Sequence, residues 1–258
     1  MSSILLVDTT LSYPMLGGQA QLSEFSEGRA PDVNRTGAGH IMIDGSQRTK
    51  SIVALDRINL KLQDGDRLGL IGRNGSGKST LLRVIAGIYE PQSGSIHVSG
   101  SVAGLFSAGL GVHPETTGYR NIILSGLMAG YSRSDAKDLL PSIAEFSELG
   151  EYLHMPVRTY SNGMAMRLTF ACATAFDADI ILMDEWLGAG DPSFQAKAQE
   201  RLRKMVDKAG ILILASHNHN VIKQSCNKVA WLDKGRLKMF GEVEEVLEAH
   251  DRTMSDAF

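Results

Sequence analysis

The sequence lacks several features that would place it in a specialised class of protein. Only two of its 258 residues are cysteines, Cys172 and Cys226, and their spacing fits neither a metal site nor a redox motif. We therefore expect a reduced, cytoplasmic setting in which both thiols are packing residues. The net charge is only −3, which provides no electrostatic footprint for nucleic acid, so no nucleic-acid partner is expected.

Long hydrophobic runs are also missing. No apolar run approaches the ~20 residues that a membrane-spanning helix needs. The N-terminal stretch Met-Ser-Ser-Ile-Leu-Leu-Val-Asp has no basic region and only a short apolar one, so we expect no signal peptide. The hydrophobic content of 43% and the charged content of 21% are typical of a soluble globular protein. Work at a membrane would require a partner that holds the chain there.

What the sequence does contain is centred on residues 67–87. Residues 67–71 (Arg-Leu-Gly-Leu-Ile) form a short apolar run that predicts a buried strand. Gly-Arg-Asn-Gly-Ser-Gly-Lys-Ser follows at once as residues 72–79, and residues 80–86 predict a helix that ends before Gly87. Strand, glycine loop and helix are the context that the phosphate-binding pattern GxxxxGK[ST] requires. Chance alone would give this pattern in roughly 1–2% of chains of this length.

The chemistry of this loop suits a nucleotide. Glycines let backbone N–H groups approach a phosphate, and the helix N-terminus adds partial positive charge. Lys78 is expected to reach the β- and γ-phosphates, and the Ser79 hydroxyl to ligate Mg²⁺. The expected nucleotide contacts of the loop are Gly72, Asn74, Gly75, Ser76, Gly77, Lys78, Ser79 and Thr80.

A second candidate group of residues ends another apolar run. Ile-Ile-Leu-Met at residues 180–183 leads into Asp184 and Glu185. Parallel strands would bring Asp184 to the same sheet edge as the glycine loop, where it could hold Mg²⁺, and Glu185 could polarise a water that attacks the γ-phosphate. A strand that ends in a solvated acid pair is the alternative, and the glycine loop makes it the weaker one.

Two further motifs are ambiguous by themselves. Ser161-Asn162-Gly163 opens a predicted helix, where Ser161 or Asn162 could be an ordinary N-cap or the helix could bind an anion. His217 follows the predicted strand 211–215, where it could donate to a γ-phosphate. His217 and His219 could instead be metal ligands, but the sequence shows no supporting Cys or His cluster.

Strands that alternate with helices predict an α/β fold with a mainly parallel sheet. Residues 17–50 have little periodicity and are interpreted as an inserted loop or hairpin, whereas residues 112–176 read as an inserted helical subdomain. Within it, an apolar stripe follows a helix-start signal at Ser132 or Ser134: Ala136, Leu139, Leu140, Ile143 and Phe146. The other expected strands are 3–13, 52–62, 95–98, 101–106, 179–184, 228–232 and 236–240, and the other expected helices are 164–176, 194–205 and 242–250.

Taken together and in order, these motifs resemble those of ABC-transporter ATPase subunits. The loop 72–79 is similar to Walker A, Tyr-Ser-Asn-Gly-Met at 160–164 to the signature motif, and 180–184 to Walker B. Glu185 matches the catalytic glutamate, Gly-Ala-Gly-Asp at 188–191 the D-loop, and His217 the switch histidine. The resemblance covers nearly all of the chain. It implies a P-loop NTPase core with an antiparallel β region, and a single ABC ATP-binding domain over residues 1–258 without a C-terminal carbohydrate-binding domain.

The resemblance also implies a mechanism. Two subunits would form a head-to-tail homodimer around two ATP molecules with Mg²⁺, each ATP held by Lys78 of one subunit and by Ser161, Asn162 and Gly163 of the other. Asp191 would communicate across the dimer. Tyr13 is the candidate for the aromatic that stacks on adenine, with packing at the strand end as the alternative. The partners would be integral membrane permease subunits, expected to be two, with the ATPase peripheral on the cytoplasmic face of the inner membrane.

Details of the motifs narrow the resemblance to exporters of O-antigen, capsule or teichoic-acid polysaccharide. These details are the YSNGM signature, the stretch Asp-Glu-Trp-Leu-Gly-Ala-Gly-Asp at 184–191, and the residues at 111–121. The cargo would be a lipid-linked polysaccharide that the permease handles. One departure is the Q-loop glutamine, for which the sequence offers only Ser107 or Ala108. The alternatives to a polysaccharide-transport ATPase are a soluble ABC ATPase acting in DNA repair or on ribosomes, and an interaction protein with an inactive nucleotide site.

Overall fold

The computed structural model describes residues 1–14, 40–43, 50–106, 112–184 and 192–255. The chain divides into two compact units, each described by itself. The first unit contains Met1 and residues 3–99 and 213–258, and the second contains Ser2 and residues 100–212. Among the described residues, no helix is both long and apolar enough to cross a membrane.

An antiparallel sheet forms one part of the first unit. Its strand order is β2-β3-β1-β5, with β1 (Ser3–Pro14) paired to both β3 (Lys50–Gln63) and β5 (Ser93–Ser99). The predicted alternation in β3 is confirmed, because Ile58, Leu60 and Leu62 are buried while the residues between them are exposed. The described part of the predicted insertion 17–50 is mainly β2 (His40–Ile43), which pairs antiparallel with β3.

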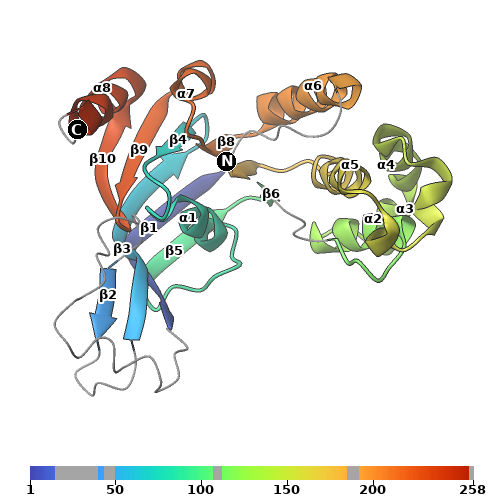
Figure 1. The fold of residues 1–258 in the computed structure, drawn as a ribbon, viewed down its shortest axis with the longest axis horizontal. Helices are drawn as coiled ribbons and strands as arrows, with labels where there is room; N and C mark the ends of the chain where they lie inside the picture. The colour runs from blue at the N-terminus through green and yellow to red at the C-terminus, as the bar shows by residue number, and fades with distance from the viewer. Residues whose placement is uncertain (15–39, 44–49, 107–111, 185–191, 256–258) are drawn as a thin grey trace. The chain divides into compact units, whose positions relative to one another are not determined.

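The other strands of the first unit carry the glycine loop. Here β4 (Arg67–Ile71) runs parallel to β9 (Lys228–Asp233), and β10 (Arg236–Glu242) is antiparallel to β9. The end of β8 (Ile211–Ala215) lies beside β4, since the Ser216 N–H donates to the Leu70 carbonyl at 3.3 Å. The helices of this unit are α1 (Lys78–Ile85), α7 (His219–Ser225) and α8 (Val243–Ser255), and α8 packs on β9 and β10 (Figure 1).

The second unit is mostly helical. Its strands β6 (Val102–Leu105) and β7 (Ile180–Asp184) pair in parallel, as expected for a mainly parallel sheet. Its helices are α2 (Gly118–Met128), α3 (Arg133–Asp138), α4 (Leu140–Ser147), α5 (Asn162–Ala173) and α6 (Pro192–Lys208), with short 3-10 turns η3 (Gly150–His154) and η4 (Val157–Thr159).

The sequence pattern suggested that the apolar stripe 136–146 lies on a single helix, but it does not. It is divided between α3 and α4, with Leu139 between them and Pro141 in the first turn of α4. Proline has no N–H to donate to the preceding turn, and its ring collides with the carbonyl four residues earlier, so a continuous helix would be interrupted there. The start signal is confirmed at Ser132, whose side chain accepts from the Asp135 N–H at 3.2 Å.

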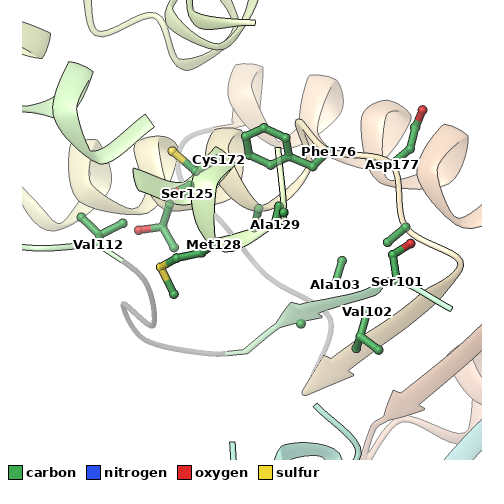
Figure 2. A pocket seen from close by; sticks show the side chains of 15 residues that line it. Ser101, Val102, Ala103, Val112, Ser125, Met128, Ala129, Cys172, Phe176 and Asp177 are labelled. Carbon is green, nitrogen blue, oxygen red and sulfur yellow. The ribbon is translucent and has the colours of Figure 1, made fainter. Parts of the chain in front are cut away.

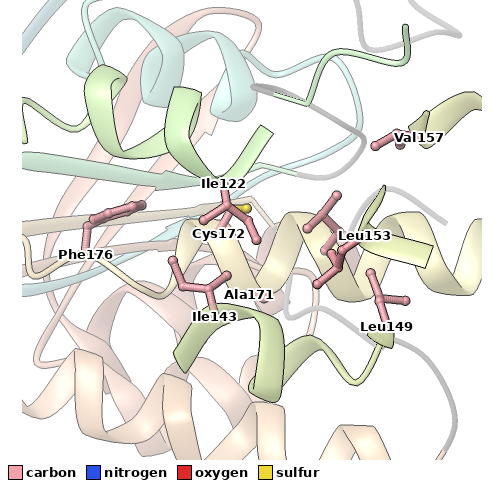
Figure 3. Close-up of a cluster of buried hydrophobic side chains, with 9 residues drawn as sticks. Ile122, Ile143, Leu149, Leu153, Val157, Ala171, Cys172 and Phe176 are labelled. Atoms are coloured by element: carbon pink, nitrogen blue, oxygen red, sulfur yellow. The ribbon is translucent and has the colours of Figure 1, made fainter. Parts of the chain in front are cut away.

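A buried apolar cluster holds the helices of the second unit together (Figure 3). Its members come from α2, α4, the N-cap of η3, η3, η4, α5 and the turn after α5: Ile122, Ile143, Leu149, Leu153, Val157, Leu168, Ala171, Cys172 and Phe176. Fully burying each large apolar side chain contributes about 1.5–3 kcal/mol. Cys172 is a packing residue, as expected, and burial raises the pKa of its thiol to about 11. Burial also raises the pKa of Cys226, to about 12.

Candidate functional site

The glycine loop leaves β4 in a conformation that side chains would obstruct. Gly72 and Gly77 have φ angles of +139° and +106°. A Cβ at Gly72 would lie 2.1 Å from the Leu232 carbonyl oxygen, and one at Gly77 would lie 2.7 Å from the Ala54 carbonyl oxygen. Both positions therefore require glycine on steric as well as conformational grounds.

The polar groups of the loop are arranged as an anion cradle. The Lys78 ammonium, on a residue only 8% exposed, donates to the carbonyls of Gly72 at 2.7 Å and Arg73 at 3.2 Å. The Ser76 hydroxyl is buried and has no hydrogen-bond partner in the described part of the chain. No side chain caps the N-terminus of α1, where Gly77 is the N-cap. A buried ammonium, an unsatisfied hydroxyl and an uncapped helix start fit a bound phosphate.

Tyr13 lies next to this cradle although 67 positions separate it from Thr80. Its hydroxyl is 3.5 Å from the Thr80 hydroxyl, and its ring meets that of Tyr89 edge-on with a centroid distance of 5.8 Å. Partial burial raises the pKa of Tyr13. Tyr89 was not singled out from the sequence, and only its place shortly after the loop helix could have indicated it. Both expected roles of Tyr13 are compatible with these contacts.

His217 also belongs to the first unit and lies at the same edge as the loop. Strand β4 ends at Ile71, directly before the loop, and β8 ends at Ala215, beside it. Ser216, the residue after β8, is buried and donates its N–H to the Leu70 carbonyl. The exposed His217 therefore lies where the chain leaves the sheet. The structure thus brings the loop and His217 to one sheet edge.

The remaining predicted residues belong to the second unit or lie outside the described residues. Asp184 is the last residue of β7 and is 8% exposed, so the acid ends a buried strand as the pattern predicted. Glu185, Asp191 and the Q-loop candidates Ser107 and Ala108 lie outside the described residues.

Ser161 is the N-cap of α5. Its side chain accepts from the Met164 N–H at 3.2 Å, which confirms the capping interpretation for this residue. Asn162 and Gly163 are exposed, and a Cβ added at Gly163 would meet nothing nearer than the Ser161 hydroxyl at 3.9 Å. The start of this helix is therefore open to a molecule that approaches from outside.

Comparisons with known proteins agree with this geometry. Residues 55–188 match the family described as ABC transporter. The O-antigen export system ATP-binding protein RfbE of Yersinia enterocolitica is 44% identical over 236 residues, which are 91% of this chain and 96% of that protein. The chain belongs to the ABC transporter family.

A second relative of this ABC protein is the teichoic acids export ATP-binding protein TagH of Staphylococcus haemolyticus, 36% identical over 81% of this chain and 79% of that protein. Among solved structures, a dimeric post-hydrolysis state of an ATP-binding cassette bound to ADP and Pi superposes with a TM-score of 0.66 at 19% identity. It covers 93% of this chain and 98% of that one. The α/β ABC ATPase fold expected from the sequence is therefore confirmed.

The second unit of this ABC protein also contains a cavity of about 410 Å³ (Figure 2). Residues 101–104 form one wall. Ser125 and Met128 of α2, Cys172 of α5 and Phe176, which follows α5, contribute to the others. Met128 of the lining is a large apolar side chain that is 75% exposed. This cavity could not be predicted from the sequence, because its walls combine segments that are far apart in the chain.

Proposed function

We propose that this chain is the ATP-hydrolysing subunit of an ABC transporter that powers export of a lipid-linked cell-surface polysaccharide, with O-antigen as the first candidate. The observation that carries the proposal is the 44% identity, over nearly the whole length of both chains, to an O-antigen export ATP-binding protein. Capsule or teichoic-acid export is the second candidate, and the similarity to TagH supports the latter.

The geometry of the cradle supports the phosphate-binding roles proposed for its residues. Lys78 binds the β- and γ-phosphates of ATP, helped by the N–H groups of the loop from Gly72 to Thr80. When bound, ATP supplies the phosphoryl group whose transfer to water provides the free energy for transport. Ser79 and Asp184 are the residues that would hold Mg²⁺, since hydroxyl and carboxylate oxygens suit this ion.

The hydrolytic residues are Glu185 and His217. Glu185 orients the attacking water and accepts its proton, and His217 donates a hydrogen bond to the γ-phosphate. The position of Glu185 directly after Asp184 and the place of His217 at the edge of the glycine loop support these roles.

The complete site is proposed to need two copies of the chain. Ser161, Asn162 and Gly163 of one copy contact the ATP held by Lys78 of the other, and the exposed start of α5 supports this arrangement. Asp191 transmits the state of one site to the second. The ATPase dimer lies on the cytoplasmic face of the inner membrane, where it works with two integral membrane permease subunits. The permease handles the polysaccharide.

A gene disruption with complementation tests this proposal. The expected result is loss of the long-chain polymer from the surface while its lipid-linked form is retained inside, as read from gels of both fractions. The parental gene should restore the surface polymer and Lys78→Ala should not. Lys61→Ala is the matched control, because Lys61 is exposed on β3 and outside the cradle. Unchanged surface glycans in the disruptant, with no second exporter gene in the genome, would refute polysaccharide export.

A further inference from the structure

A second cluster of metal-binding side chains lies outside the nucleotide site, where α7 packs on α8 in the first unit. His219 is the first residue of α7, and His250 and Asp251 are neighbours in α8. The Nδ1 atoms of His219 and His250 lie 3.4 Å and 3.6 Å from Asp251 Oδ1. The sequence had suggested His217 and His219 as possible metal ligands, but without further Cys or His residues to complete a site. The structure places two further potential metal ligands beside His219, from a helix about thirty positions further along the chain.

His250 presents a nitrogen atom that the protein leaves unsatisfied. Its Nδ1 is buried and has no hydrogen-bond partner within the described residues, and the side chain is only 12% exposed. The ring is held edge-on by Trp231 at a centroid distance of 5.0 Å and by His219 at 5.3 Å. A buried imidazole that is fixed by its aromatic neighbours, and whose ring nitrogen makes no hydrogen bond within the described residues, is suited to bind a metal ion.

The two distances from the histidine nitrogens to the Asp251 carboxylate are close to those of tetrahedral coordination. Bonds of about 2.0–2.1 Å to zinc place two ligands of a tetrahedron ~3.3–3.4 Å apart. The two distances to Asp251 Oδ1 are 3.4 Å and 3.6 Å, and the ligand atoms of all three residues lie within 4.8 Å of one another. Only a small movement of the side chains would bring all three into contact with one ion.

We propose that His219, His250 and Asp251 form a divalent transition-metal site, with Zn²⁺ as the preferred ion. Two imidazoles with one carboxylate favour zinc over Mg²⁺ and Ca²⁺, which select oxygen ligands. Asp251 is 63% exposed, so the fourth position is open to water. The carboxylate neutralises part of the ion's charge.

The position of the site predicts what the metal does. The ion would fix the first residue of α7 to α8, and Asn218, which caps α7, connects that residue to His217. Bound zinc therefore stabilises the segment that follows the switch histidine, without contact to the nucleotide. This consequence does not depend on which polysaccharide is exported.

Metal titration of the full chain, free of any affinity tag, tests the proposal. Zn²⁺ and Co²⁺ are added without ATP and with Mg²⁺ in excess, so that oxygen-only sites are filled. We expect one Co²⁺ per chain with the strong visible absorption of a four-coordinate ion, competition by Zn²⁺, and a higher Tm with Zn²⁺. His219→Gln and Asp251→Asn should each weaken binding at least tenfold and remove the Tm shift. His97→Gln is the matched control, since His97 is exposed on β5.

Two results would overturn the site. One is equal Zn²⁺ affinity for the parent, both ligand variants and the control, which would place the ion elsewhere. The other is a parent chain without the four-coordinate Co²⁺ spectrum or the Tm shift, which would leave the cluster as an ion pair only. If His219→Gln does not fold, Asp251→Asn decides, because its exposed side chain can change to an amide of the same size without loss of packing.

Discussion

At the scale of single residues, Gly72 is the position where backbone conformation and nucleotide binding meet. Its φ of +139° is accessible almost only to glycine, and a Cβ there would lie 2.1 Å from the backbone oxygen of Leu232. Both the strain and the collision fall on the first residue after β4, so any relief must move the loop that holds Lys78.

We therefore expect Gly72→Ala to lower the free energy of unfolding by about 1–3 kcal/mol and to weaken ATP binding by at least tenfold. Urea denaturation and titration with a fluorescent ATP analogue measure the two effects. Gly65→Ala is the control, because Gly65 has a φ of +91° but nothing within 4 Å of its added Cβ. It should lose about 1–2 kcal/mol and keep full affinity. Equal affinities for both variants would show that the loop tolerates the shift.

The residues of the candidate nucleotide site could be proposed from the sequence because their chemistry is local. Lys78 and Ser79 follow the glycine loop directly, and Asp184 ends a strand that reads as four apolar residues. Tyr89 and the pair His250 and Asp251 could not be predicted in this way. Each depends on a tertiary contact between helices, strands or loops, and no sequence spacing encodes such a contact.

At the scale of elements, the strands were predicted best. The buried strands β4, β7 and β8 are mainly apolar runs whose short length favours a strand over a helix, and β3 shows the alternation of a half-buried strand. Helix limits were predicted less well. The split between α3 and α4 follows from Pro141, but the apolar stripe runs through it and hides the break. β2 was not assigned separately, because its stretch lacks periodicity and its pairing with β3 is set by tertiary contacts.

Two helix caps allow a prediction that separates stability from function. Ser161 caps α5 and Ser132 caps α3 with the same geometry: each side chain accepts from the N–H three residues on, at 3.2 Å. Replacing either serine by alanine should cost about 1 kcal/mol of stability. Only Ser161→Ala should also reduce ATP hydrolysis, by tenfold or more, because only this helix start is proposed to meet the ATP of a second subunit.

Thermal unfolding and steady-state phosphate release measure the two quantities for both caps. Ser161→Thr should recover most of the stability and part of the activity, since threonine also caps helices. Loss of activity to the same extent in Ser132→Ala and Ser161→Ala would show that the signature serine acts through helix stability alone.

At the scale of the whole molecule, the proposed mechanism requires two chains to close around ATP and hydrolysis to separate them. Glu185→Gln removes the base but keeps the size of the side chain, so it should bind ATP, hydrolyse it ~10²-fold or more slowly, and accumulate as a dimer with ATP and Mg²⁺. Light scattering after gel filtration measures the mass.

Glu200→Gln, on the exposed face of α6 beside Lys204, is the matched control and should remain monomeric while turning over ATP. Lys78→Ala should fail to dimerise, because the phosphates that join the subunits are not held. A Glu185→Gln chain that stays monomeric with ATP and hydrolyses it at the parental rate would contradict both the role of Glu185 and the closed dimer.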